Sequence, residues 1–164
     1  PVVPGTQRGD RGTEPPHQLE DLDMREVESA VPPPALLKGA KFSRQFAVSP
    51  SVYEGFLQTF NDRNPYHVSD AAAQARGFAG KIMHGNILNG FLSYFVGECL
   101  PVKTVVIQSQ EIKFRKPVYL HDTVTLQAEV ADYHESVRSA EFTFQFLNQN
   151  QVKVASGKLL VGLL

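Results

Sequence analysis

The segment from Asp62 to His67 reads D-R-N-P-Y-H and carries a carboxylate and an imidazole five residues apart. Asn64-Pro65 is a turn dipeptide, so the two side chains can face each other across the turn. An imidazole titrates near neutrality and can both take and give a proton. Such a pair suits general acid–base chemistry, in which a proton is removed beside a thioester carbonyl and water is added or lost.

A second candidate group, His84-Gly85, opens a long apolar segment. If a helix starts there, its free N–H groups and dipole favour an anion, and a glycine lets a carbonyl oxygen come close. Each feature alone also has a purely structural explanation. Asp62 would then cap a helix, His67 would lie on the surface, and His84 would cap or pack. Ser93, in mid-helix, would bond to its own backbone.

Composition restricts the partners. A chain of 164 residues with 42 % hydrophobic residues is long enough for one ordinary domain. The formal net charge of -1 gives no field that would attract nucleic acid or an anionic membrane, and no apolar run approaches the ~20 residues that span a bilayer. Cys99 is the only cysteine and no Cys/His pair has zinc-ligand spacing, so we expect no disulfide, no metal and a cytoplasmic, reducing location.

The first residues differ from the rest. Seven of the 11 prolines lie in residues 1–34, among many charges and few large apolar side chains. We expect residues 1–35 to form a Pro-rich, mostly irregular arm, with at most a short helix near Asp21–Ser29, and residues 36–164 to form the folded domain. The arm has no apolar signal segment and is too acidic for a mitochondrial presequence. Because the chain starts with proline, we expect a processed chain or a fragment.

Hydrophobic periodicity predicts an α+β fold in which an antiparallel sheet wraps around one long helix. Residues 41–48 read as a strand, and a helix then starts near Ser49 with a capping box of Ser51 and Glu54. Residues 69–76 read as a short helix stopped by Gly77. Residues 85–100 are apolar almost all round, which is typical of a helix buried on most sides. Four alternating strands follow, at 105–114, 124–130, 140–146 and 152–163.

These motifs together resemble the MaoC-like hydratases and dehydratases, which include the (R)-specific enoyl-CoA hydratases and have the hotdog fold. The resemblance runs from Lys41 to the C-terminus. It rests first on an aromatic residue that precedes a D-x-N-P-x-H segment and on a small residue six positions after the histidine of that segment. It also rests on an [IV]-x-H-G segment, on a serine in the helix that follows, and on an F-x-x-P-V-x-x-x-D segment. The matching residues are Phe56, Asp62, Asn64, Pro65, His67, Ala73, Ile82, His84, Gly85, Ser93, Phe114, Pro117, Val118 and Asp122.

The resemblance implies that Asp62 and His67 are a catalytic dyad holding the reactive water and that the Gly85 N–H is the oxyanion donor. It also implies a homodimer whose sheets join, with each acyl thioester in a tunnel at the interface. The substrate would be carried on coenzyme A or phosphopantetheine, without a further cofactor, and an acyl carrier protein is left open as a partner. The residues expected to contact substrate are Asn64, Tyr66, His84, Asn86, Ser93, Arg115 and Lys116.

The chain departs from the family pattern at Phe60, Asn61, Tyr66, Asn86 and His121, the last in place of a turn glycine. Tyr66 either shortens the acyl pocket or packs on the first helix, and we favour packing. A basic cluster, Lys113, Arg115 and Lys116, is either a solvated strand end or a contact for phosphate groups.

The expected activity is that of a hydro-lyase interconverting trans-2-enoyl and (R)-3-hydroxyacyl thioesters. A thioester hydrolase on the same fold and a non-catalytic thioester-binding subunit of a larger complex are the alternatives.

Overall fold

A computed structural model describes residues 36–164 of the chain. The predicted Pro-rich arm and its short helix near Asp21–Ser29 lie outside the described residues. In the described part of the chain, no helix is both long enough and apolar enough to cross a membrane.

Five antiparallel strands form one sheet in the order β1-β3-β4-β5-β2. The strands are β1 (Lys41–Ala47), β2 (Val105–Phe114), β3 (Thr123–His134), β4 (Ser139–Asn148) and β5 (Lys153–Leu163), with a 3-10 turn, η3 (Glu135–Val137), between β3 and β4. Strand β3 has the predicted alternation, with Val124, Leu126 and Val130 on the buried face. The predicted strands are therefore confirmed, because a period of two puts one apolar face on the core.

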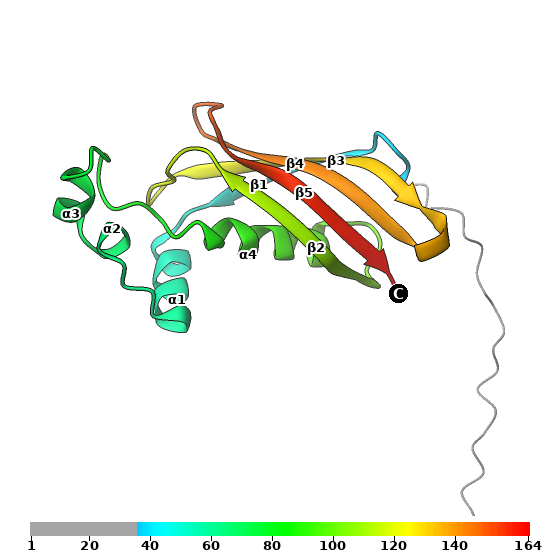
Figure 1. The fold of residues 1–164 in the computed structure, drawn as a ribbon, viewed down its shortest axis with the longest axis horizontal. Coiled ribbons are helices and arrows are strands. Elements are labelled where there is room, and N and C mark those ends of the chain that lie inside the picture. Colours follow the sequence, from blue (N-terminus) through cyan, green and yellow to red (C-terminus); the bar gives the residue numbers. More distant parts are fainter. Residues whose placement is uncertain (1–35) are drawn as a thin grey trace, which may run out of the picture.

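The central helix lies along one face of this sheet (Figure 1). It consists of α4 (Asn86–Tyr94) and a final π-type turn, η2 (Phe95–Cys99), which ends before Pro101. Its buried residues pack into the core with the sheet: Ile87, Leu88, Leu92, Phe95 and Val96. The prediction that the helix is buried on most sides is wrong for the single chain. The sheet covers one side, and Asn86, Gly90, Ser93, Tyr94 and Gly97 are exposed.

Three short helices gather at one end of the sheet (Figure 1): α1 (Pro50–Phe60), α2 (Pro65–Val68) and α3 (Asp70–Gln74). The predicted capping box is replaced by Ser49, whose side chain accepts a hydrogen bond from Val52 N at 3.3 Å. Pro50 is suited to the first turn, which makes the residue before it the cap. The single turn α2 follows directly after the predicted Asn64-Pro65 turn, with Asn64 as its N-cap. It precedes α3, and Gly77 follows with a φ of +84°, as expected for the residue that stops a helix.

Candidate functional site

The loop between α1 and α2 places the predicted dyad. Asn61, at a φ of 50°, is the C-cap that ends α1. The Asp62 carboxylate then accepts a hydrogen bond from Asn64 N at 3.2 Å, and the Asn64 side chain accepts one from Tyr66 N at 3.1 Å. Asn64 is thus the N-cap of α2, on which His67 lies. The loop is held by its own side chains, and this fixes the relative positions of Asp62 and His67.

Two histidines meet beside Asp62. The rings of His67 and His84 are 4.2 Å apart between centroids. His67 Nδ1 lies 2.9 Å from the Ile82 carbonyl oxygen, and His84 Nε2 lies 2.8 Å from the Asp62 carbonyl oxygen. One carboxylate oxygen and one nitrogen from each ring all lie within 4.8 Å of one another. Acid–base groups that are distant in sequence therefore share one small space.

Aromatic rings enclose His84. The Phe56 ring lies 4.6 Å from it and the Tyr53 ring 6.0 Å, between centroids. The Tyr53 hydroxyl also donates a hydrogen bond to the His67 carbonyl oxygen at 3.0 Å. His84 is only 3 % exposed, and its Nδ1 has no hydrogen-bond partner among the described residues. A buried nitrogen without a partner is uncommon, and it marks a position where a ligand or water would be held.

Gly85 lies at the start of α4, as predicted. Its N–H donates no backbone hydrogen bond within residues 36–164, so it is free to bind an oxyanion at the positive end of the helix. A Cβ on this residue would lie 3.0 Å from the Phe114 ring. Glycine thus lets the Phe114 ring approach closely and leaves the space that a carbonyl would need.

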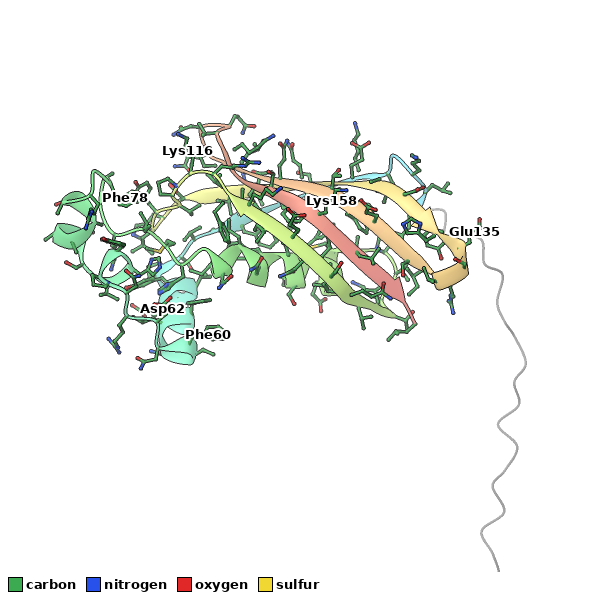
Figure 2. The ribbon with its side chains drawn as sticks, in the orientation of Figure 1. Phe60, Asp62, Phe78, Lys116, Glu135 and Lys158 are labelled. Atoms are coloured by element: carbon green, nitrogen blue, oxygen red, sulfur yellow. The ribbon has the colours of Figure 1, made fainter. Side chains whose placement is uncertain are left out.

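The site opens into a cavity of about 470 Å³, whose lining includes Asp62, His67, His84, Gly85 and Asn86. A second, apolar groove of about 750 Å³ runs between α1 and α4. Phe56, Phe60, Ile87 and Phe91 contribute its apolar lining. Asp62 and Asn86 line both spaces, so Asp62 stands where the cavity meets the groove, and His67 lines the cavity alone. Figure 2 shows Asp62 beside Phe60 at the end of the molecule that carries the short helices.

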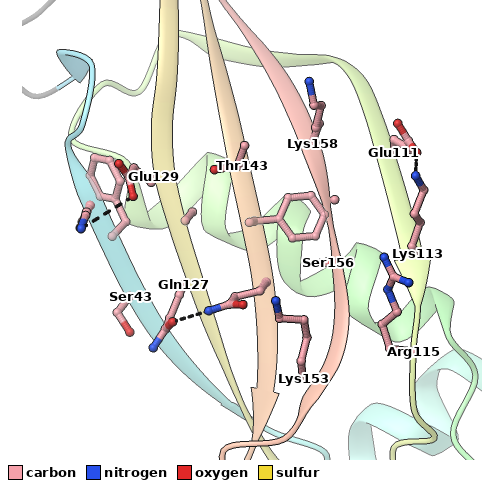
Figure 3. Close-up of a pocket in the computed structure, with 16 residues that line it drawn as sticks. Ser43, Glu111, Lys113, Arg115, Gln127, Glu129, Thr143, Lys153, Ser156 and Lys158 are labelled. Atoms are coloured by element: carbon pink, nitrogen blue, oxygen red, sulfur yellow. Dashed lines mark hydrogen bonds and ion pairs between the residues drawn. The ribbon is translucent and has the colours of Figure 1, made fainter.

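Only part of the predicted basic cluster lines the cavity. Lys113 is paired with Glu111 at 2.9 Å on the outer face of the sheet (Figure 3), outside the cavity. This cation holds the pKa of the Glu111 carboxyl below its usual value, through a hydrogen bond and direct charge attraction. Arg115 and Lys116 line the cavity, and Arg115 also lines the groove on the outer face. Two of the three cations therefore remain available to an anionic part of a substrate.

Three predicted contact residues, Asn64, Tyr66 and Ser93, do not line the cavity, and the Asn64 side chain instead caps α2. Ser93 is exposed on α4 and lines neither the cavity nor the groove. Tyr66 lies near Phe78, with 6.5 Å between ring centroids, and its carbonyl accepts a hydrogen bond from Ile82 N at 3.0 Å. Tyr66 thus has an aromatic neighbour in the segment after α3, and its packing on the first helix stays a prediction. The contact roles of all three residues stay predictions.

Two residues that contact the site were not among the predicted contacts. The Phe114 ring packs against Gly85, and the Tyr53 hydroxyl donates a hydrogen bond to the backbone carbonyl of His67. The sequence carried a signal for each, since Phe114 belongs to the F-x-x-P-V segment and Tyr53 to the apolar stripe of α1. Neither signal says that the side chain reaches the dyad, because that contact depends on the packing of α1 and β2 against α4.

Comparison with known proteins agrees with this geometry. Residues 35–149 match the family described as "MaoC like domain". The chain is 29 % identical over 124 residues to an (R)-specific enoyl-CoA hydratase of Aeromonas caviae, an alignment that covers 76 % of this chain and 91 % of that protein. It is 38 % identical over 85 residues to a 3-hydroxybutyryl-CoA dehydratase of Methylorubrum extorquens, covering 52 % of this chain and 54 % of that protein.

Solved structures share the architecture. The (R)-hydratase of A. caviae involved in PHA biosynthesis superposes with a TM-score of 0.74 at 27 % identity, covering 80 % of this chain and all of that chain. The R-hydratase PhaJ1 of Pseudomonas aeruginosa superposes with a TM-score of 0.71 at 23 % identity, covering 78 % and 82 %. These superpositions confirm the predicted hotdog fold.

Proposed function

The chain belongs to the MaoC-like domain family, and we propose that it is a hydro-lyase that interconverts trans-2-enoyl and (R)-3-hydroxyacyl thioesters. One observation carries the proposal: the Asp62 carboxylate and a ring nitrogen of His67 lie within 4.8 Å of each other, in a cavity that also contains the N-terminus of α4. A base and an oxyanion donor in one cavity are what addition of water to an enoyl thioester requires.

In hydration, Asp62 and His67 hold a water between them. The hydrogen bond to Ile82 indicates that His67 Nδ1 carries its proton, which leaves Nε2 as the base. The water oxygen bonds to C3 as Nε2 takes one of its protons, and the C2=C3 electron pair moves towards the carbonyl. The Gly85 N–H donates to the resulting enolate oxygen. The proton then returns from the dyad to C2, and dehydration reverses these steps.

The cavity and the apolar groove indicate which end of the substrate would lie on each side of the dyad. Arg115 and Lys116 line the cavity side, where they would pair with phosphate groups of coenzyme A or of a carrier-bound phosphopantetheine. The acyl chain would then enter the apolar groove between α1 and α4. We propose no cofactor beyond the carrier. The choice of carrier, contact with an acyl carrier protein and the cytoplasmic location remain predictions.

We also propose the homodimer. Strand β2 is ten residues long and lies at the edge of the sheet, where it pairs only with β5 within residues 36–164. Val106, near its start, is 40 % exposed, and Phe114, at its end, is 51 % exposed. A long edge strand with free hydrogen-bonding groups is a template for pairing with a second strand. The second copy would extend the sheet and complete the substrate tunnel.

Light scattering on the purified chain tests the dimer. We expect a mass twice the 18.2 kDa of one chain. Val106→Lys should shift the population towards the monomer, because a buried lysine at the joint opposes association. Val137→Lys is the matched control, since Val137 is also exposed (63 %) but lies on the turn between β3 and β4. A monomeric wild type would contradict the proposed assembly.

The activity test follows loss of the enoyl-thioester absorbance of crotonyl-CoA and of a medium-chain enoyl-CoA. Asp62→Asn and His67→Gln should each reduce the rate by about 10²–10⁴-fold, whereas His134→Gln, on the exposed end of β3, should not. Wild-type turnover in either dyad variant would overturn the mechanism. Release of free thiol would indicate the hydrolase alternative. Complete inactivity on both substrates, and on a carrier-bound one, would favour the non-catalytic subunit.

A further inference from the structure

The dyad belongs to a larger cluster. Asp62, His67 and His84 are the group of three potential metal ligands that the described residues bring together, with ligand atoms within 4.8 Å of one another. We propose that these three side chains bind a divalent cation of the zinc class, which displaces the reactive water and reversibly inhibits the enzyme. The inhibition rests on the proposed function, but the binding does not. Sequence spacing predicted no metal here, because His84 is 17 residues from His67.

Hydrogen bonds to the backbone set the free nitrogen of each ring. A carbonyl oxygen only accepts, so the ring nitrogen facing it must carry the proton. His67 therefore donates from Nδ1 to the Ile82 carbonyl, and His84 donates from Nε2 to the Asp62 carbonyl. His67 Nε2 and His84 Nδ1 are left with lone pairs. Imidazoles that ligate metals are held in this way, with the second nitrogen bonded to a carbonyl or carboxylate.

The buried nitrogen of His84 is the second, independent observation. Its ring is 3 % exposed, and Nδ1 has no partner among the residues that the structure describes. Acid–base catalysis by Asp62 and His67 does not by itself use this atom. A cation would satisfy it directly, and the rings of Phe56 and Tyr53 beside His84 would shield the bond from water.

The geometry is close to that of a three-ligand zinc site. Zinc lies about 2.0–2.2 Å from nitrogen and carboxylate ligands, so tetrahedral ligand atoms are about 3.4 Å apart. The three side chains need to close by at most about 1.4 Å from the observed 4.8 Å limit. Asp62 is exposed, and its hydrogen bond to Asn64 N uses one carboxylate oxygen, Oδ1, which leaves the other oxygen for the cation. The fourth position would face the cavity, as in zinc sites that keep a water.

Cation binding at these residues would inhibit the enzyme because it occupies the groups that activate the water. The cation takes the His67 Nε2 lone pair that would accept the proton of the water, and it takes the Asp62 charge that would orient that water. No base then remains beside C3. Removal of the cation by a chelator returns both groups, so the inhibition should be fully reversible.

The full purified chain, stripped with EDTA, is titrated with Co²⁺ while the visible absorption bands of the ion are recorded, and with Zn²⁺ by calorimetry. We expect one cation per chain and intense bands of four- or five-coordinate cobalt. Asp62→Asn and His84→Gln should each weaken binding at least about tenfold. His134→Gln is the matched control, because it removes a histidine that also faces a carboxylate, Glu141 at 4.0 Å, away from the cluster.

Asp62 is exposed, so its variant keeps the test valid if His84→Gln fails to fold. Absence of cobalt bands, or bands that persist in both variants, would overturn the site. The two proposals fail separately. A chain that hydrates crotonyl-CoA but binds no cation refutes the metal site alone. A chain that binds cobalt through these residues but has no activity refutes the hydro-lyase alone. Activity that Zn²⁺ leaves unchanged at saturation refutes the inhibition.

Discussion

Gly157 is the position where the structure is most sensitive to one methyl group. It lies in β5 opposite Ile112 of β2. A Cβ on Gly157 would be 1.8 Å from the backbone carbonyl oxygen of Glu111 and 2.8 Å from Cζ of Phe144. Ordinary contact is about 3.4 Å or more, so Gly157→Ala must push β2 away from β5 by about 1.6 Å. The obstructing atom is backbone, which cannot rotate aside as a flexible side chain can.

This displacement sets the magnitude. Overpacking of this kind costs about 1–3 kcal/mol, and each ladder hydrogen bond that is stretched beyond reach costs about 0.5–1.5 kcal/mol more. With two such bonds lost, we expect the free energy of unfolding to fall by about 2–6 kcal/mol. For a chain of this size, that lowers Tm by about 10 °C. Far-UV circular dichroism with heat and urea measures both quantities.

Gly55→Ala is the matched control. Gly55 is exposed in the middle of α1, with no atom within 4 Å of the Cβ position. The same methyl should therefore raise stability by up to about 1 kcal/mol through helix propensity alone. Because β2 ends at Phe114, beside Gly85, Gly157→Ala should also reduce the hydration rate. A Gly157→Ala protein within about 1 kcal/mol of wild type would refute the reasoning.

Three further predictions follow from single contacts. His121 has a φ of 71°, so His121→Gly should raise the free energy of unfolding by about 0.5–1 kcal/mol in urea titrations; destabilisation would count against strain there. Gly85→Ala should lower kcat by about 10²-fold, because the methyl must displace Phe114 or the substrate carbonyl; unchanged kcat would exclude close approach. Lys113→Gln should raise the pKa of the Glu111 carboxyl towards its usual value, since the attracting cation is gone; an NMR titration with no shift would contradict that pairing.

Much of the fold was predictable because the signals are local. Strand β3 alternates apolar and polar residues, and a period of two already says which side chains face the core. The Asn64 cap and the Asp62 contact span two residues each, so the turn that carries the dyad depends on its own sequence. Gly85 at the start of α4 also follows from the change in periodicity. Resemblance to a family then linked these pieces to one activity.

Tertiary structure decided what surrounds the dyad. His84 reaches the Asp62 carbonyl across 22 residues, and no local pattern predicts that bond or the free nitrogen it leaves. Lys113 and Arg115 are two apart in sequence, yet one pairs with Glu111 while the other reaches the cavity as β2 ends. The sheet covers only one side of α4, which leaves Ser93 exposed. Local backbone preferences act over a few residues, whereas the chemistry of the site depends on contacts made only when α1, α4 and the sheet pack together.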